Sequence, residues 1–363
     1  MRKVNQYFPL ESTFLTDEET GRRVRQVTNA QAITHHPFFL APCFDEKQRW
    51  LCMVTFRTGQ GQIMLEDQRQ QCLRIVTNVC GLDEWSLSVK DEWIYFVADG
   101  QVWRVLGENG ESELLLSESD VRNLAGSEAF MADGTTAVTK SGRYLAVRVK
   151  TGAKGYAILI RDNKNGQWAN VCTCPVATHV QFCPDDDDLL FFAGPLTDRP
   201  WVLHWPSGQA KLIYHRNAAA KQWITHESWI PGTREMSLVD WPHGVLAVHV
   251  DTGAVRRVTD WNAWHAICSD DGTRMVFDTN FPDRGVYTLD PRICLSTPEH
   301  LCSPHASCMG EHWAGAFPYD HGPIKVYAPQ HTHPHPRFSP DGKRIVFTSD
   351  CSGIAQVYEI NLP

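Results

Sequence analysis

Three histidines and a glutamine lie within residues 330–335, and this density of nitrogen and oxygen donors could hold a metal ion. In an extended chain, side chains two residues apart point to the same side, so His333 and His335 can bind one ion together. His331 alternates out of phase with them and is not expected to take part. The segment therefore predicts one half of a metal site.

The composition indicates which classes of partner to expect. The 363-residue chain is 42% apolar and carries a formal net charge of −8. No apolar stretch reaches the length of a signal peptide or a membrane span, so we expect a soluble cytoplasmic protein with no membrane partner. The acidic charge argues against nonspecific nucleic-acid binding, which requires a basic surface. The twelve cysteines lack paired spacing, so we expect reduced thiols in the core. Nothing in the sequence indicates the oligomeric state.

A tight turn followed by an apolar strand recurs seven times along the chain. Residues 338–347, 268–277 and 139–147 align well, and the seven units are about 40 to 70 residues apart. That spacing is typical of four-stranded propeller blades. We predict an all-β fold, one seven-bladed β-propeller over residues 1–363, with blades at approximately 34–79, 83–117, 129–174, 178–215, 224–260, 263–300 and 328–363.

The seventh blade lacks a fourth strand, because the chain ends soon after its third. Residues 19–29 are similar to the fourth strand of the fifth blade, which ends at Asp260. We therefore expect residues 1–29 to supply a closing strand to the C-terminal blade, leaving no open sheet edge. A sandwich or two smaller β domains would also fit the alternation and turns. Neither would explain why one strand is missing and a matching one is surplus.

The blade alignment locates a cluster of histidines. Counting back five residues from the turn residue that aligns with Pro340 reaches one position in each blade: Ala41, Glu84, Thr135, His179, His226, His265 and His335. Four consecutive blades place histidine in this slot, near the start of the innermost strand. Innermost strands line the central channel. We therefore expect the four imidazoles to converge near one mouth of the channel.

Spacing and blade register together favour a metal site formed by His265, Gln330, His333 and His335. Three imidazoles and one amide do not by themselves name the metal. Loops on the same face of the ring contribute basic side chains, which suit a ligand that carries carboxylates. The residues expected to contact such a ligand are His179, Arg57, Lys154 and Arg284, with Lys150 and Arg199 on the same face.

These motifs resemble the oligogalacturonate lyases of polysaccharide lyase family 22. The resemblance covers most of the chain and is strongest at residues 330–342 and 225–231. It implies a cytoplasmic enzyme of pectin degradation that cleaves short oligogalacturonides by β-elimination, giving 4,5-unsaturated products. It also implies a divalent cation, typically manganese, held by the metal site above. In this resemblance His226 is the base and Arg199 assists it.

Three other interpretations are open. Short loops at residues 149–156 and 280–285 would suit a divergent uronate lyase with a different substrate preference. A non-catalytic propeller that binds sugars or proteins would carry these histidines incidentally. An iron oxygenase would use four channel histidines as ligands and leave Gln330 unused; those ligands would be His179, His226, His265 and His335.

Overall fold

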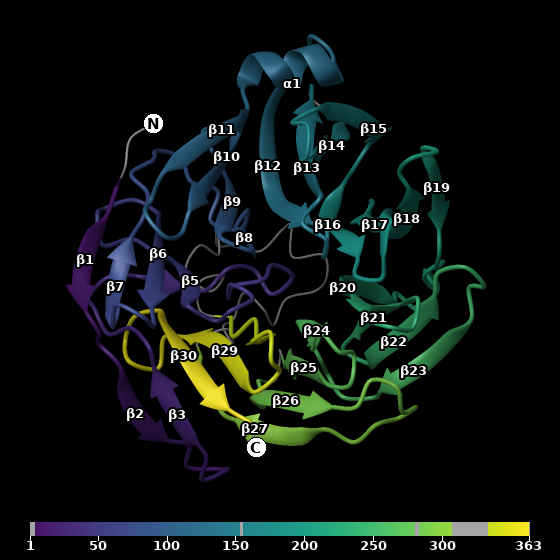
Figure 1. Ribbon diagram of the computed structural model, residues 1–363. Helices are drawn as coiled ribbons and strands as arrows, with labels where there is room; N and C mark the ends of the chain where they lie inside the picture. The colour runs from purple at the N-terminus through teal and green to yellow at the C-terminus, as the bar shows by residue number, and fades with distance from the viewer. Residues whose placement is uncertain (1–3, 153–154, 280–282, 307–332, 363) are drawn as a thin grey trace, which may run out of the picture.

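The computed structural model describes residues 4–152, 155–279, 283–306 and 333–362. Within these ranges seven antiparallel sheets are arranged in a ring, as Figure 1 shows. The prediction of an all-β, seven-bladed propeller is confirmed.

Blades two to six each contain four strands that follow one another along the chain. Blades two and three comprise β8 (Ser88–Lys90), β9 (Trp93–Ala98), β10 (Gln101–Leu106), β11 (Ser112–Leu116), β12 (Ala129–Val138), β13 (Tyr144–Thr151), β14 (Tyr156–Asp162) and β15 (Trp168–Cys174). Blades four and five comprise β16 (Thr178–Cys183), β17 (Asp186–Ala193), β18 (Pro200–His204), β19 (Gln209–Leu212), β20 (Trp223–Ile230), β21 (Glu235–Trp241), β22 (Gly244–His249) and β23 (Val255–Thr259). Blade six comprises β24 (Ala266–Cys268), β25 (Met275–Asp278), β26 (Val286–Leu289) and β27 (Glu299–Cys302).

Blades one and seven share the N-terminal segment. Blade one comprises β4 (Thr34–His35), β5 (Trp50–Thr55), β6 (Gln62–Asp67), β7 (Cys72–Ile75) and, at its outer edge, β1 (Gln6–Pro9). Blade seven comprises β28 (Arg337–Phe338), β29 (Arg344–Ser349), β30 (Gln356–Asn361), and then β3 (Arg23–Gln26) and β2 (Thr13–Thr16). Because Val24 of β3 pairs with Ile360 of β30, closure of the ring by an N-terminal strand is confirmed. The sequence did not predict the fifth strand of these two blades, β1 in blade one and β2 in blade seven.

Apolar side chains fill the spaces between neighbouring blades. Trp50 of blade one packs in one cluster with Val89 and Phe96 of blade two. Ile267 of blade six packs with Phe347 of blade seven in another cluster. Strands whose two faces are both covered in this way read as nearly continuous apolar runs in the sequence.

The cysteines are only partly a core feature. All eleven described cysteines are free thiols, which agrees with the expected reduced state. Five of them are buried, whereas the others are half-buried or exposed: Cys72, Cys80, Cys172, Cys174, Cys294 and Cys351. The expectation of core thiols is therefore correct for the buried five only.

One helix, α1 (Glu118–Ala125), connects blades two and three in the described part of the chain. Ser117 begins it with a capping box: the Asp120 N–H donates to Ser117 Oγ, and the Ser117 N–H donates to the Asp120 carboxylate. Over the residues that the structure describes, no helix has the length and apolar content needed to cross a membrane.

The residues after β4 cross the centre of the ring. The centroid of the Phe38 ring lies 5.6 Å from that of His179 in blade four and 5.6 Å from that of His335 in blade seven. A side chain that contacts blades on both sides of the ring must lie near its axis. Arg337 fixes the crossing, because its Nη1 donates to the main-chain oxygen of Phe39 at 2.9 Å.

Because of this crossing, the register predicted for blade one is wrong at Ala41. Ala41 does not share the slot of the four histidines; it lines a separate cavity of 220 Å³ together with Arg337. The strand pattern resumes only at Phe44, which forms a β-bridge with Leu51. The five-residue count from the turn therefore reaches the crossing segment instead of the start of the innermost strand.

Candidate metal and catalytic site

The four histidines of the shared slot converge at one end of the channel. Between neighbouring blades, the ring centroids of His179 and His226 are 5.8 Å apart, and those of His226 and His265 are 4.3 Å apart. The centroids of His265 and His335 are 4.0 Å apart. The expected convergence of these four imidazoles is therefore observed.

Irregular backbone aims three of these imidazoles inward. His179, His226 and His335 have φ values of 51°, 44° and 45°, in the left-handed region that residues with side chains rarely adopt. The ladders of blades four and five are also interrupted at His179 and His226. A bulge turns a side chain out of the regular alternation of a strand, and such features concentrate at functional sites.

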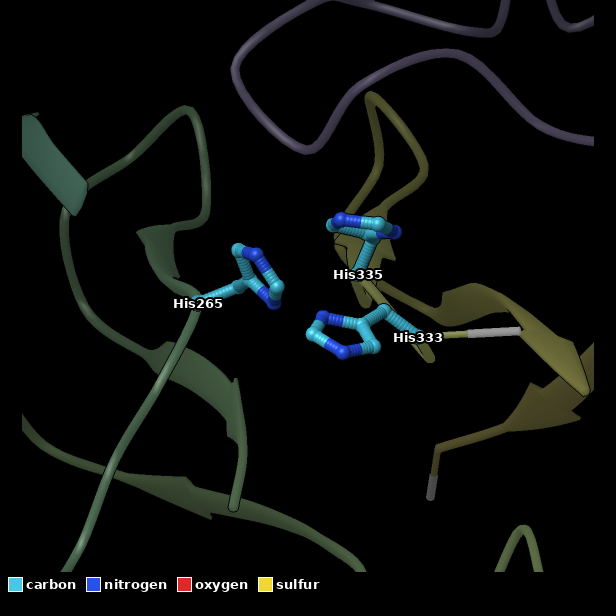
Figure 2. Close-up of side chains that lie close together, drawn as sticks. All are labelled: His265, His333 and His335. Atoms are coloured by element: carbon cyan, nitrogen blue, oxygen red, sulfur yellow. The ribbon is translucent and has the colours of Figure 1, made fainter. Parts of the chain in front are cut away.

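His265, His333 and His335 form a buried cluster of the metal-binding type. Their ligand nitrogens all lie within 4.8 Å of one another. Figure 2 shows the three imidazoles facing a common centre, one from the start of blade six and two from the segment that enters blade seven. Gln330, the predicted fourth ligand, lies outside the described residues.

The surroundings of the cluster fit a divalent cation. His265 Nδ1 lies 2.9 Å from a carboxylate oxygen of Asp278, and the main-chain N–H groups of His265 and His335 donate to the same carboxylate at 2.7 and 3.1 Å. Burial raises the pKa of Asp278 to about 7, while electrostatic interaction with His333 and the two main-chain N–H donors oppose that shift. With Nδ1–H directed at Asp278, Nε2 of His265 presents its lone pair. A ligand histidine in proteins usually has its second nitrogen anchored in this way.

The protonation state of the ligands also suits a cation. Burial lowers the pKa of His265 and His335 well below the ordinary value for histidine. Both imidazoles are therefore neutral near pH 7, and only a neutral imidazole can bind a metal through its lone pair.

His226 lies beside the cluster with one nitrogen committed. Its Nδ1 is 2.6 Å from the main-chain oxygen of Trp264; a carbonyl only accepts, so Nδ1 carries the hydrogen and Nε2 the lone pair. Burial, followed by the neighbouring His265 and His179, lowers the pKa of His226 well below its ordinary value. Among the described residues, His179 and His226 are not in the group whose ligand atoms meet within 4.8 Å. That geometry disfavours a four-histidine iron centre and leaves His226 suited to act as a base.

Arg199 and His179 share one buried carboxylate, that of Glu227. Arg199 Nε lies 2.5 Å from one oxygen, and His179 Nδ1 lies 2.8 Å from the other. Burial alone would raise the pKa of Glu227, but the charge of Arg199 and the hydrogen bond from His179 bring it down to about 2. Glu227 is therefore ionised at neutral pH, and it holds Arg199 beside His179, whose Nδ1 lies 3.4 Å from Nη2 of Arg199.

The imidazoles line a cavity of 420 Å³, within the size range of small-molecule sites. The three-histidine cluster lies along one part of its wall, while Asp83, Asp133 and Arg148 line another. Arg148 pairs with Asp133 at 2.8 Å, and burial raises the pKa of Asp83. Trp85 and Trp264 also line the cavity and offer it apolar surface.

The remaining basic residues expected at the channel mouth are not found in the histidine cavity of the described structure. Arg57 donates two hydrogen bonds of 2.7 Å to the carboxylate of Glu11, which ties it to the N-terminal segment. Arg284 lines a separate cavity with Asp283. Neither of them, nor Arg199, is among the described residues that line the histidine cavity, and Lys154 lies outside the described residues. Their predicted contact with substrate gains no support from these positions.

Three residues of the site were not anticipated from the sequence. Asp278 lies 13 residues after His265, on the next strand of the same blade. Aligning that second strand across the blades, as was done for the first, could have identified it. Glu227 directly follows His226, and an acidic residue in the middle of a predicted innermost strand was a signal that could have been used. Phe38 had no comparable signal, because aromatic residues are common in propeller cores.

Known proteins similar to this chain include lyases that act on oligogalacturonate. No protein-family model matches the chain. Oligogalacturonate lyase of Dickeya dadantii is 24% identical over an alignment of 400 residues, covering 96% of this chain and 95% of that protein. Oligogalacturonide lyase of Pectobacterium atrosepticum is 23% identical over 406 residues, covering 98% and 97%. The resemblance seen in the sequence is confirmed over nearly the full length.

A solved structure described as oligogalacturonate lyase in complex with manganese has the same fold. It superposes with a TM-score of 0.82 and 21% identity, covering 100% of this chain and 99% of that chain. At this level of identity the match establishes the propeller architecture, and the chemistry must be argued from the residues of the site.

Proposed function

We propose that the protein is a metal-dependent lyase that cleaves short oligogalacturonides by β-elimination to 4,5-unsaturated uronates. One observation carries the proposal: a neutral imidazole, His226, lies with its ring centroid 4.3 Å from that of His265, a member of the three-histidine cluster. Full-length relatives named oligogalacturonate and oligogalacturonide lyase support the choice of substrate.

β-Elimination on a uronate requires a base and a means of limiting negative charge. Nε2 of His226 takes the proton from C5, next to the sugar carboxylate. Arg199 donates to that carboxylate and offsets the charge that develops as the proton leaves. The electron pair of the C5–H bond forms the C4–C5 double bond, the C4–O bond breaks, and the departing oxygen gains a proton from water.

The three-histidine cluster, with Gln330 as the proposed fourth ligand, would hold a divalent cation. When bound, such a cation supplies positive charge to the uronate carboxylate and makes the C5 proton more acidic. We propose manganese because a structurally similar oligogalacturonate lyase is described in complex with it. Nitrogen-rich ligand sets also accept iron, cobalt, nickel and zinc, so the metal requires its own measurement.

The test is an assay of chelator-treated protein before and after reloading with Mn²⁺. Incubation with digalacturonate and trigalacturonate should produce ultraviolet absorbance from the unsaturated uronate only after reloading. Neutral galactose oligomers of the same length are the matched control, and they should not react because they lack the carboxylate. No absorbance with any of the five metals and any uronate oligomer would contradict the proposal. Binding of oligogalacturonide without cleavage would then identify a non-catalytic sugar-binding propeller.

A further inference from the structure

We infer that Glu227 is a positioning residue that holds Arg199 and His179 in fixed, complementary roles toward one uronate ring; the inference rests on the proposed lyase function. Glu227 is fully buried, at 0% exposure. Its two oxygens are separately engaged, one with Arg199 Nε at 2.5 Å and one with His179 Nδ1 at 2.8 Å. Because both oxygens are committed, Glu227 acts through these two partners.

The irregular strand of blade five makes this arrangement possible. The ladder between β20 and β21 is interrupted around His226 and Glu227. The two successive side chains therefore reach opposite neighbours, His226 toward the main chain of Trp264 in blade six and Glu227 toward His179 in blade four. Gln181 of blade four anchors the same point, because its Nε2 donates to the main-chain oxygen of Glu227 at 2.7 Å. The base and the positioning carboxylate are thus set by one local distortion.

The carboxylate decides which nitrogen of His179 carries the hydrogen. Nδ1 is 2.8 Å from Glu227 and 3.4 Å from Nη2 of Arg199. An ionised carboxylate only accepts, and the shorter, charge-assisted contact is the stronger one, so Nδ1–H donates to Glu227. Nε2 of His179 remains an acceptor. Since His179 lines the cavity, it offers that acceptor to a sugar hydroxyl.

The same carboxylate leaves Arg199 as a donor. Its Nε is held by Glu227, and the N–H groups on its Nη atoms are directed by that contact. A guanidinium group binds a carboxylate well. Arg199 is not among the described residues that line the cavity, but its Nη2 lies 3.4 Å from Nδ1 of His179, which does line it. We therefore expect donor Arg199 and acceptor His179 to meet a carboxylate and a neighbouring hydroxyl on one sugar ring. A neutral sugar would leave the guanidinium without its anion, so the pair selects for uronates.

The decisive variant is Glu227→Gln, which keeps the shape of the side chain. Its amide can accept from one partner only, because the other end donates. We expect kcat/KM on digalacturonate to fall about 10- to 100-fold, the range typical of residues that orient a functional group, with Mn²⁺ affinity unchanged. Imidazole ¹⁵N chemical shifts should show His179 changing from the Nδ1–H to the Nε2–H tautomer.

A matched control lies in the same blade, where Glu235 pairs with Arg256 at 2.8 and 2.5 Å. Glu235→Gln removes a comparable carboxylate pair away from the cavity, so kcat/KM and the His179 tautomer should stay as in the wild type. Glu227→Asp keeps the charge but is one methylene shorter, so it reaches a single partner and should retain part of the activity. This second variant also serves if Glu227→Gln does not fold.

A double-mutant cycle with Arg199→Lys separates positioning from independent action. If Glu227 acts through Arg199, the two losses combine to less than their sum. A folded Glu227→Gln protein with wild-type kcat/KM and an unchanged His179 tautomer would overturn the inference, as would fully additive losses. An inactive wild-type protein would instead overturn the proposed lyase function, while the tautomer measurement would still decide whether Glu227 fixes His179.

Discussion

His226 and Glu227 are neighbours in the chain, yet their protonation states are set by different surroundings. His226 is neutral because it is buried among other imidazoles. Glu227 is ionised because the charge of Arg199 and the hydrogen bond from His179 outweigh its burial. Pairs of titratable groups whose pKa values are pushed apart are typical of sites that move protons. The site therefore has a neutral imidazole, which is the base of the proposed mechanism, next in sequence to an ionised carboxylate.

Replacing His226 by alanine should lower kcat by about 10²- to 10⁴-fold, because the lone pair that takes the proton is lost. Metal content should not change, since His226 is outside the three-histidine cluster. Steady-state kinetics and elemental analysis of the same preparation measure both quantities. His243→Ala, at an exposed position of the same blade, is the control. A His226→Ala protein that keeps its metal and its full kcat would remove the base assignment.

Cys172 should be the most pH-sensitive of the half-buried thiols near neutrality. A hydrogen bond from Cys174 lowers the pKa of Cys172 to about 7, whereas burial raises the pKa of Cys72. The thiolate is the reactive form, so alkylation of Cys172 should accelerate as pH rises through about 7. Cys174→Ala should move that midpoint upward. Mass spectrometry of iodoacetamide-treated protein measures this, and equal labelling of Cys72 and Cys172 at pH 7 would contradict it.

At the scale of strands, the blade register predicted the histidine cluster because a repeat fixes position relative to its turn. His179, His226, His265 and His335 each precede such a turn by the same count, and innermost strands line one channel. Blade one departed from the register because the chain crosses the channel before the strand pattern resumes. An insertion of this kind changes the spacing while leaving the apolar pattern intact.

The loop arginines could not be placed from the sequence, because their partners come from distant segments. Arg57 is 46 residues from Glu11, and Arg199 is 28 residues from Glu227. The carboxylate with which a loop arginine pairs depends on how the blades pack. That packing cannot be predicted from the residues close to the arginine in the sequence.

Asp278, at the end of β25, contacts His265 and the main chain of His335 in the three-histidine cluster. If this cluster is the metal site that we propose, Asp278→Asn should weaken metal binding. An amide cannot accept from Nδ1 of His265 and from both main-chain donors as a carboxylate does. Titration calorimetry with Mn²⁺ should show an affinity about 10- to 100-fold lower. Asp271→Asn, in the turn that precedes β25, is the control and should leave the affinity unchanged. An Asp278→Asn protein that binds Mn²⁺ as tightly as the wild type would show that the carboxylate does not support the ligands.

At the scale of the whole molecule, the N-terminal segment joins the two ends of the ring. Its β3 was predictable, because the sequence of blade seven lacks a fourth strand and the N-terminal segment contains a strand that matches it. Its β1, which pairs with β7 of blade one, was not predictable, since four residues that end in proline carry no usable alternation. The segment therefore adds a strand to both blades at the seam, and the seam should be where the stability of the ring depends most on single residues.

Arg25 is the residue on which this seam should depend. From β3 it pairs with Glu66 of blade one and, at 3.3 Å, with Glu359 of blade seven. Glu66 is fully buried, so Arg25→Ala would leave its charge without a cation and should lower the free energy of unfolding by about 3–5 kcal/mol. Arg23→Ala, on the same strand with its guanidinium over the exposed ring of Phe14, should cost no more than about 1 kcal/mol. Urea unfolding curves measure both.

The double variant Arg25→Ala with Glu66→Gln identifies the cause of the expected loss. If an uncompensated buried charge is responsible, neutralising Glu66 should recover a large part of the stability lost in Arg25→Ala, because the main cost lies in burying an ion without its partner. If the two variants unfold at the same urea concentration, the contribution of Arg25 comes from the packing of its side chain between the blades. The ring would then be closed by its strand pairing and apolar contacts, with the ion pair as a minor addition.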